Sequence, residues 1–132
     1  MRKGVMTLTW KESIDENVRL GIVELLILHM LLERDMYGYE IREELAVRTN
    51  NAFLVKEGSL YGPLYRMQSR GIITSRKEMV VNKRFRMYYM LTDHGREYLE
   101  YGKEQMKLVF AGVESLLNWE GADNEQNREE DN

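Results

Sequence analysis

The chain contains no cysteine and only one proline, and it has no long hydrophobic run. Without cysteine, a disulfide scaffold, a thiolate nucleophile and a Cys-ligated metal site are excluded. The longest apolar run, IVELLILHMLL at 22–32, is interrupted by Glu24 and His29, whereas a membrane-spanning helix needs about 20 apolar residues. The small-residue cleavage pattern of a signal peptide is also missing. We therefore expect a buried helix in a cytoplasmic protein.

Patterns typical of enzymes are absent as well. No HExxH, Walker or GxGxxG pattern occurs, and neither histidine has a nearby nucleophile in the sequence. We expect no catalytic residue, no metal and no cofactor. His29 lies in an apolar stretch and is expected to be a satisfied core residue, whereas His94 is expected to face solvent.

The net charge of −3 hides a strong segregation of charge along the chain. Residues 120–132 hold six acids and one base, which gives −5 and leaves +2 on residues 1–119. Between residues 66 and 86, seven bases stand against Glu78 alone, an excess of +6. Such an excess can attract a polyanion even in an acidic chain. A solvated hairpin with scattered charges would show the same excess, so charge alone leaves both interpretations open.

With 132 residues, the chain has the length of one domain with a small extension. Hydrophobic periodicity, with Asp15, Asp35 and Thr92 as N-terminal caps, predicts helices at 16–34, 36–47, 59–70 and 92–119. Strands are predicted at 72–77 and 85–91. Three helices followed by a β-hairpin indicate a mainly α winged helix-turn-helix with a long C-terminal helix. We divide the chain into an extension (1–15), a DNA-binding domain (16–91), a dimerisation helix (92–119) and a disordered acidic tail (120–132).

The third predicted helix and the hairpin suit DNA recognition. A helix fits the major groove and contacts bases from its N-terminal half. There the helix offers Ser59 and Tyr61, with Arg66 further along, while Leu60, Leu64 and Met67 form its inward stripe. The hairpin supplies Lys83, Arg84 and Arg86, which suit backbone phosphates or the adjacent minor groove. Tyr61 and Tyr65 could equally be packed aromatics with hydroxyls in water.

The last predicted helix carries one apolar stripe at helical spacing. Its members are Leu99, Met106, Val109, Phe110, Val113, Leu116 and Leu117. Three short helices and a hairpin cannot cover so long a stripe, so we expect a second copy to cover it. The resulting homodimer would place two recognition helices about 34 Å apart, matching a palindromic DNA site. Gly102 and Gly112 interrupt this helix at a cost of about 1 kcal/mol each, and they permit either a close crossing or a kink.

Three stretches together resemble the PadR family of bacterial transcriptional regulators. They are ELLILHMLLERDMYGYEI at 24–41, EGSLYGPLYRMQSRGII at 57–73 and RFRMYYMLTDHGREYL at 84–99. The resemblance implies a winged helix-turn-helix, a dimer made mainly through the C-terminal helix, and repression by operator binding that an effector relieves. The short C-terminal region is similar to that of the family's smaller size class.

The resemblance also implies roles for individual residues. Tyr37, Tyr39, Ser59 and Tyr61 match positions implicated in DNA contact, and Lys83, Arg84 and Arg86 match the basic wing. The family usually has proline directly after the tyrosine of GSLY, whereas this chain has Gly62 and then Pro63. If Ser59 caps the helix, Pro63 removes a hydrogen bond to the Ser59 carbonyl, and the start of the helix is loosened or shifted.

Two questions of binding remain open in the sequence. Some small-class members bind planar aromatic drugs at the dimer centre through a tryptophan of the last helix. Here Phe110 and Trp119 are the candidates for a small aromatic or hydrophobic effector, and ordinary dimer packing is the alternative. The second open question is the function itself. The alternative to a DNA-binding repressor is a winged-helix protein-interaction module without sequence-specific DNA binding.

Overall fold

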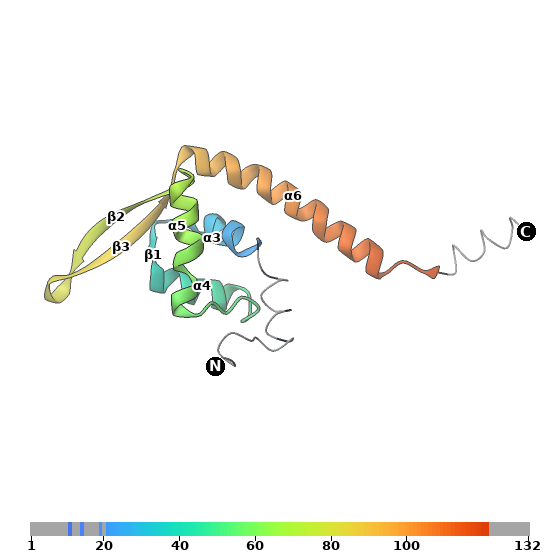
Figure 1. Ribbon diagram of the computed structural model, residues 1–132, viewed down its shortest axis with the longest axis horizontal. Coiled ribbons are helices and arrows are strands. Elements are labelled where there is room, and N and C mark those ends of the chain that lie inside the picture. Colours follow the sequence, from blue (N-terminus) through green and yellow to red (C-terminus); the bar gives the residue numbers. More distant parts are fainter. Residues whose placement is uncertain (1–10, 12–13, 15–18, 20, 122–132) are drawn as a thin grey trace, which may run out of the picture.

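The computed structural model describes residues 11, 14, 19 and 21–121 (Figure 1). The predicted Asp15 cap, the extension with Trp10, and the acidic tail beyond residue 121 lie outside the described residues. Among the residues that are described, no helix is long and apolar enough to cross a membrane.

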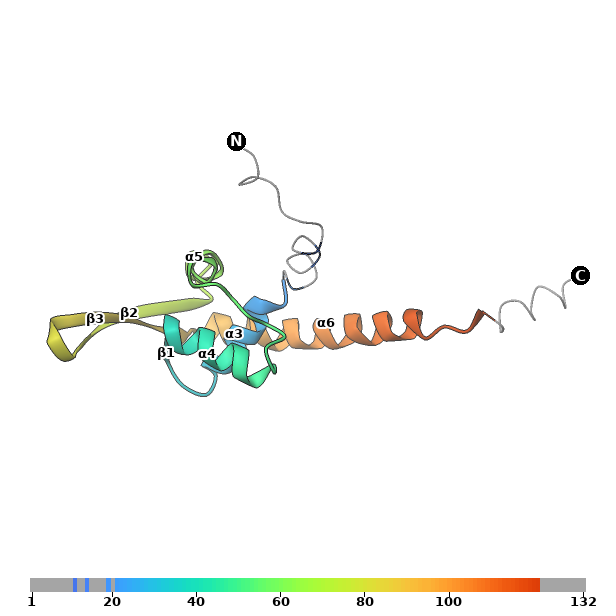
Figure 2. The same ribbon diagram turned by 90° about the horizontal axis from the view of Figure 1, so that it is seen from below.

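The described chain is a winged helix-turn-helix with a long C-terminal helix, as the sequence predicted. The helices are α3 (Val23–Leu31), α4 (Gly38–Arg48), α5 (Tyr61–Ser69) and α6 (Asp93–Leu117), with short 3₁₀ turns η1 (Glu57–Ser59) and η2 (Val81–Lys83). The strands β1 (Met36–Tyr37), β2 (Ile73–Val80) and β3 (Arg84–Leu91) form an antiparallel sheet in the order β1-β3-β2. The β2–β3 wing and α6 extend in opposite directions from the body formed by α3, α4 and α5 (Figures 1 and 2).

The first predicted helix is shorter in the structure. Gly21 has φ +92°, a left-handed conformation that interrupts a helix, and α3 begins at Val23. It ends at Leu31, before the predicted Arg34. Burial of Ile27, Leu28 and Met30 on its inner side agrees with the expectation of a buried helix.

The predicted start of the second helix was wrong. Met36 and Tyr37 are not helical but form β1, pairing with Tyr89 and Tyr88 of β3. The helix α4 begins at Gly38, and the Tyr37 N–H donates to Glu40 Oε1 at 3.2 Å. Asp35 therefore does not cap the helix. This acid accepts a hydrogen bond from Arg76 of the wing instead, which joins β2 to the loop before β1.

One hydrophobic core unites the helices and the base of the wing. Its buried members are Ile27, Leu28, Met30, Leu31, Met36, Ile41, Leu45, Leu60, Leu64, Met67, Ile72, Ile73, Tyr89 and Leu99. Leu99 is only 2% exposed within its own chain. A side chain that is already buried adds no area to a dimer interface, so Leu99 is corrected from an interface residue to a core residue.

Three contacts fix the start of α6 against β2. The Thr92 hydroxyl accepts from the Gly95 N–H at 2.9 Å, which confirms the predicted cap. The same hydroxyl lies within hydrogen-bonding distance of the Gly71 and Ile72 carbonyls. Gly95 lies so close to Ile72, the residue before β2, that a Cβ there would stand 2.0 Å from the Ile72 oxygen. The first turn of α6 is thus held firmly on the sheet.

The two glycines in the interior of α6, Gly102 and Gly112, occupy different surroundings. A Cβ at Gly102 would lie 2.5 Å from Leu25 Cδ2, so this glycine permits a close crossing of α6 over α3. At Gly112 a Cβ would meet no described atom within 4 Å. The helix ends at Leu117, two residues before the predicted Trp119.

Candidate nucleic-acid interface

Helix α5, the predicted recognition helix, begins two residues later than the sequence predicted. Ser59 closes the 3₁₀ turn η1, and Leu60 occupies the N-cap of α5. Pro63 is therefore the third helical residue, where the backbone N–H would have no partner within the helix. The first bond of the helix runs from the Leu64 N–H to the Leu60 carbonyl at 3.2 Å. Ser59 is not the cap, and Pro63 removes no hydrogen bond from this helix.

The two faces of α5 differ as predicted. Leu60, Leu64 and Met67 are buried in the core, whereas Tyr61 and Tyr65 are exposed. The structure therefore contradicts the alternative in which these tyrosines are packed aromatics. An exposed tyrosine on a helix offers its hydroxyl as a donor to a phosphate oxygen.

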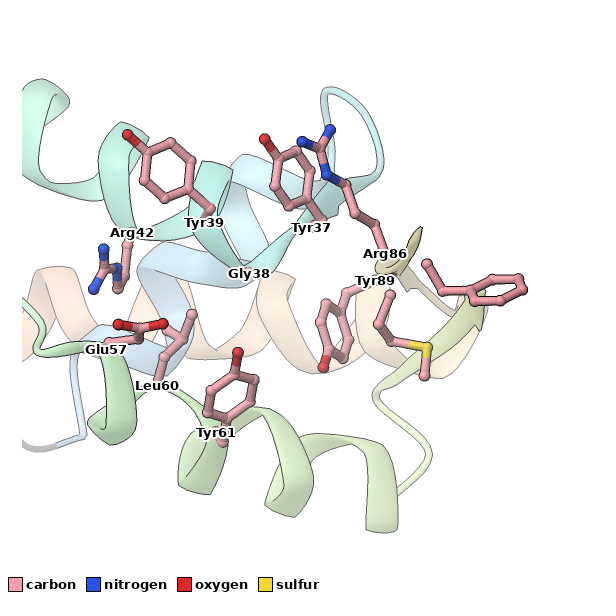
Figure 3. A pocket seen from close by; sticks show the side chains of 11 residues that line it. Tyr37, Gly38, Tyr39, Arg42, Glu57, Leu60, Tyr61, Arg86 and Tyr89 are labelled. Carbon is pink, nitrogen blue, oxygen red and sulfur yellow. The ribbon is translucent and has the colours of Figure 1, made fainter. Parts of the chain in front are cut away.

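The N-termini of α4 and α5 meet the edge of β3 around a notch of about 240 Å³ (Figure 3). It is lined by Tyr37, Gly38, Tyr39, Arg42, Glu57, Leu60, Tyr61, Phe85, Arg86, Met87 and Tyr89. Helix N-termini carry free N–H groups and a partial positive charge, and both favour anions. The structure thus brings together three tyrosines that the resemblance assigned to DNA contact, namely Tyr37, Tyr39 and Tyr61.

Arg42 is a residue of this notch that the sequence reasoning missed. Its guanidinium carbon lies 5.8 Å from the centre of the Tyr39 ring. The spacing of three residues along α4 places the two side chains on one face. The i, i+3 spacing from Tyr39 was the signal that could have linked it to the family's tyrosines.

Arg86 lies on β3 opposite Glu78, two residues closer to the wing tip than Tyr88, where the pairing with β1 ends. Its guanidinium carbon is 4.3 Å from the centre of the Tyr37 ring, close enough for a cation–π interaction. The Tyr37 ring also lies 5.5 Å from the Tyr88 ring on β3. Figure 3 shows the Arg86 side chain reaching from the strand toward Tyr37. Arg86 therefore ties the wing to the start of α4.

The tip of the wing carries cations with no acidic partner. Asn82 and Lys83 have φ of 66° and 59°, the left-handed turn that reverses the hairpin. Within residues 21–121, Lys83 and Arg84 are exposed and form no ion pair. By contrast, Arg76 pairs with Asp35 and Glu78, and hydrogen bonds to these acids raise the pKa of its guanidinium. Lys83 and Arg84 therefore place positive charge at the tip that no acid of the described residues neutralises.

Arg66 is also paired within the chain. Its guanidinium donates to Glu24 Oε2 of α3 at 3.0 and 3.2 Å. An exposed pair of this kind contributes about 0–1 kcal/mol. Glu24 takes two of the guanidinium N–H donors of Arg66 and offsets its charge, so the predicted DNA contact competes with an internal ion pair.

The histidines form no metal centre with the acids of the described residues. No group of three or more His, Cys, Asp or Glu side chains able to hold a metal was found in the part of the chain that the structure describes. His94 is exposed as expected. The expectation that His29 is a core residue was wrong, because it lies on the solvent side of α3.

Comparison with known protein families decides the identity of the fold. The model of the transcriptional regulator PadR-like family matches residues 27–101, which span α4, α5, the wing and the first part of α6. The chain belongs to this family. As a PadR-like protein it is a transcriptional regulator with a DNA-binding winged helix, and the family does not consist of enzymes.

Individual relatives agree with this assignment. The chain is 39% identical over 79 residues to an uncharacterized protein of Lysinibacillus sphaericus, covering 60% of this chain and 72% of the relative. A PadR-like transcriptional regulator of Bacillus cereus is 33% identical, with a TM-score of 0.67 over 79% of this chain and 99% of that one. Bacillus subtilis PadR, solved in complex with operator DNA, is 25% identical, with a TM-score of 0.57 over 61% of this chain and 45% of that one.

Proposed function

We propose that this PadR-like regulator is a homodimeric repressor that binds a pseudo-palindromic operator in the cytoplasm. The observation that carries the proposal is the shared surface of α4, α5 and the wing, where two helix N-termini adjoin a wing with unpaired cations at its tip. The operator complex of Bacillus subtilis PadR supports double-stranded DNA as the partner.

Individual contacts follow from this surface. Tyr37, Tyr39 and Tyr61 would donate hydroxyls to phosphates at the notch, beside the cation of Arg42. Ser59, in the turn before α5, would contact the same strand. Lys83 and Arg84 would neutralise phosphates beside the minor groove, and Arg86 would hold the wing in place.

The dimer is proposed from the outer half of α6. Val109, Phe110, Val113, Leu116 and Leu117 are 48–75% exposed there, and Met106 is half-buried. Monomeric proteins rarely expose so continuous an apolar strip. A second copy packed along this strip covers it, with residues 92–119 acting as the dimerisation helix and 16–91 as the DNA-binding domain.

We further propose that a small aromatic or hydrophobic effector releases the operator. Phe110 and Trp119 are both exposed, and Phe110 belongs to the strip that the partner would cover. A planar ligand held between two copies of Phe110 would alter the crossing of the helices and hence the spacing of the two recognition helices. The alternative is that Phe110 and Trp119 only pack against the partner copy. Quenching of Trp119 fluorescence by an added planar aromatic compound would support ligand stacking, and unchanged fluorescence would support packing alone.

Selection of bound sequences from random DNA tests the operator proposal directly. A two-fold symmetric dimer is expected to enrich a pseudo-palindrome with half-sites about one DNA turn apart. Recovery of no enriched sequence at low ionic strength would contradict the proposed function and favour a protein-interaction module.

Replacing Lys83 or Arg84 with alanine tests the wing contacts. Each lost phosphate contact should reduce the magnitude of the slope of log K, the DNA-binding constant, against log salt concentration by about 0.9, because fewer counterions are released on binding. A dimer loses one contact per copy, so the reduction should be about twice this value. Affinity should fall for all DNA sequences alike. Fluorescence anisotropy over a salt series measures both quantities. Lys107→Ala, which removes an exposed cation from α6, is the control, and an unchanged slope in Arg84→Ala would contradict the wing assignment.

A further inference from the structure

The distal half of the wing has no third strand to support it. The strand β1 pairs with β3 only at Tyr88 and Tyr89, so the hairpin beyond these residues consists of β2, β3 and the η2 turn alone. Figure 1 shows it projecting away from the body. Side chains on this part of the hairpin meet solvent unless a partner covers them.

This unsupported segment carries apolar side chains where a solvated hairpin would carry polar ones. Met79 and Phe85 are directly paired across the strands and are 62% and 59% exposed. Val81, in the turn, is 80% exposed. Exposed apolar side chains that gather in one place mark a contact surface. We call Met79, Val81 and Phe85 the wing-tip patch.

The wing-tip patch lies on the recognition-helix side of the sheet. Side chains alternate along a strand, so Phe85 shares a face with Tyr89. Tyr89 is buried and points toward α5 (Figure 3). Its cross-strand partner Ser75 accepts a hydrogen bond from Gln68 of α5 at 3.0 Å. A duplex that receives α5 therefore meets Met79 and Phe85 on the same side of the wing.

Cations surround the wing-tip patch. The Lys77 ammonium lies 5.8 Å from the centre of the Phe85 ring, and Lys83 and Arg84 lie between Val81 and Phe85 in the sequence. The one acid in this segment, Glu78, is bound by Arg76. An apolar patch inside a positive rim complements a surface that is apolar within and negative at its edges. The minor groove has this character, because deoxyribose walls lie between two rows of phosphates.

We propose that the wing-tip patch enters the minor groove beside each half-site and acts as an apolar wedge. This inference depends on the proposed DNA-binding function. Val81 packs against the deoxyribose walls or a base step, Met79 and Phe85 cover the adjacent sugar, and the cations bind the flanking phosphates. Apolar wedges of this kind partly unstack a base step and bend the duplex. Pyrimidine–purine steps are the easiest to deform, so the flanks of the operator are expected to favour TA or CA/TG.

The test compares Val81→Ser and Phe85→Ser in the full chain on an operator obtained by selection. Because both side chains are mostly exposed, folding should be unchanged, as circular dichroism would verify. Each variant loses the favourable removal of a valine or phenylalanine side chain from water on binding, so each should bind about tenfold more weakly or worse. The salt slope should stay unchanged, since no phosphate contact is lost. The bend angle, measured by energy transfer between labelled DNA ends, should decrease.

Val47→Ser is the matched control, because Val47 is 68% exposed at the far end of α4. If Val81→Ser and Phe85→Ser keep wild-type affinity and bend, the wedge is refuted while DNA binding stands. If either variant changes the sedimentation of the free protein, the patch contacts a second copy and the wedge is likewise refuted. Failure of the wild type to bind any DNA refutes the proposed function itself.

Discussion

The Val113→Asp variant is expected to sediment as a monomer and to lose operator binding. Val113 is 49% exposed near the middle of the apolar strip on α6. In a two-fold dimer the substitution buries two carboxylates without partners, and an uncompensated buried charge costs about 3–5 kcal/mol. Each monomer would then bind one half-site alone and lose the avidity of two linked contacts, which is worth about 10²–10⁴ in affinity.

Ser115→Asp provides the control for this experiment. It adds the same charge to the same exposed helix, two residues and hence about 200° further around the axis. We expect this variant to remain a dimer and to bind the operator. Sedimentation velocity and anisotropy on one DNA duplex measure both properties. A Val113→Asp protein that still sediments as a dimer would show that the copies meet elsewhere.

Features set by local periodicity were predicted correctly from the sequence. The spacing of Leu60, Leu64 and Met67 identified the buried face of α5, and the alternation after Phe85 identified β3. The Thr92 cap was also correct, because a threonine hydroxyl finds its N–H within the same turn. Such features depend on residues at most four positions apart. They made the fold class predictable.

Features set by distant contacts were missed. The two-residue strand β1 is too short for any periodicity, and only its pairing with β3 defines it. The ion pair of Arg66 was missed, because its partner Glu24 lies 42 residues earlier in the chain. Leu99 fits the stripe of α6 by spacing, but the first turns of that helix pack on α3 and leave only the outer half exposed.

The candidate site was predicted in part for the same reason. The family resemblance supplied Tyr37, Tyr39 and Tyr61, and the structure gathers them around one notch. Their contact with DNA stays a prediction. Sequence alone could not show that Arg86 lies against Tyr37 while Lys83 and Arg84 stay free. That difference separates a residue that positions the wing from residues that attract phosphates, although all three belong to one basic run.

Replacing Gly95 with alanine is expected to destabilise the fold severely. The added Cβ would stand 2.0 Å from the Ile72 oxygen and 3.0 Å from Leu91 Cδ1. Backbone atoms cannot swing aside as a flexible side chain can, so α6 would have to move away from β2. That movement breaks the hydrogen bonds of Thr92 to the Gly71 and Ile72 carbonyls. Overpacking of this kind typically costs about 1–3 kcal/mol, and we expect a loss at or above the upper value.

Gly62→Ala is the matched control, since Gly62 also lies in the first turn of a helix. A Cβ there would meet only Arg66 Nη1 at 3.6 Å, an ordinary contact. Alanine should therefore be neutral or stabilise by up to about 1 kcal/mol. Thermal unfolding at one protein concentration, which keeps the dimer contribution fixed, should lower the Tm of Gly95→Ala by roughly 10 °C. Equal melting of the two variants would mean that the first turn of α6 is not docked on Gly71 and Ile72 as described.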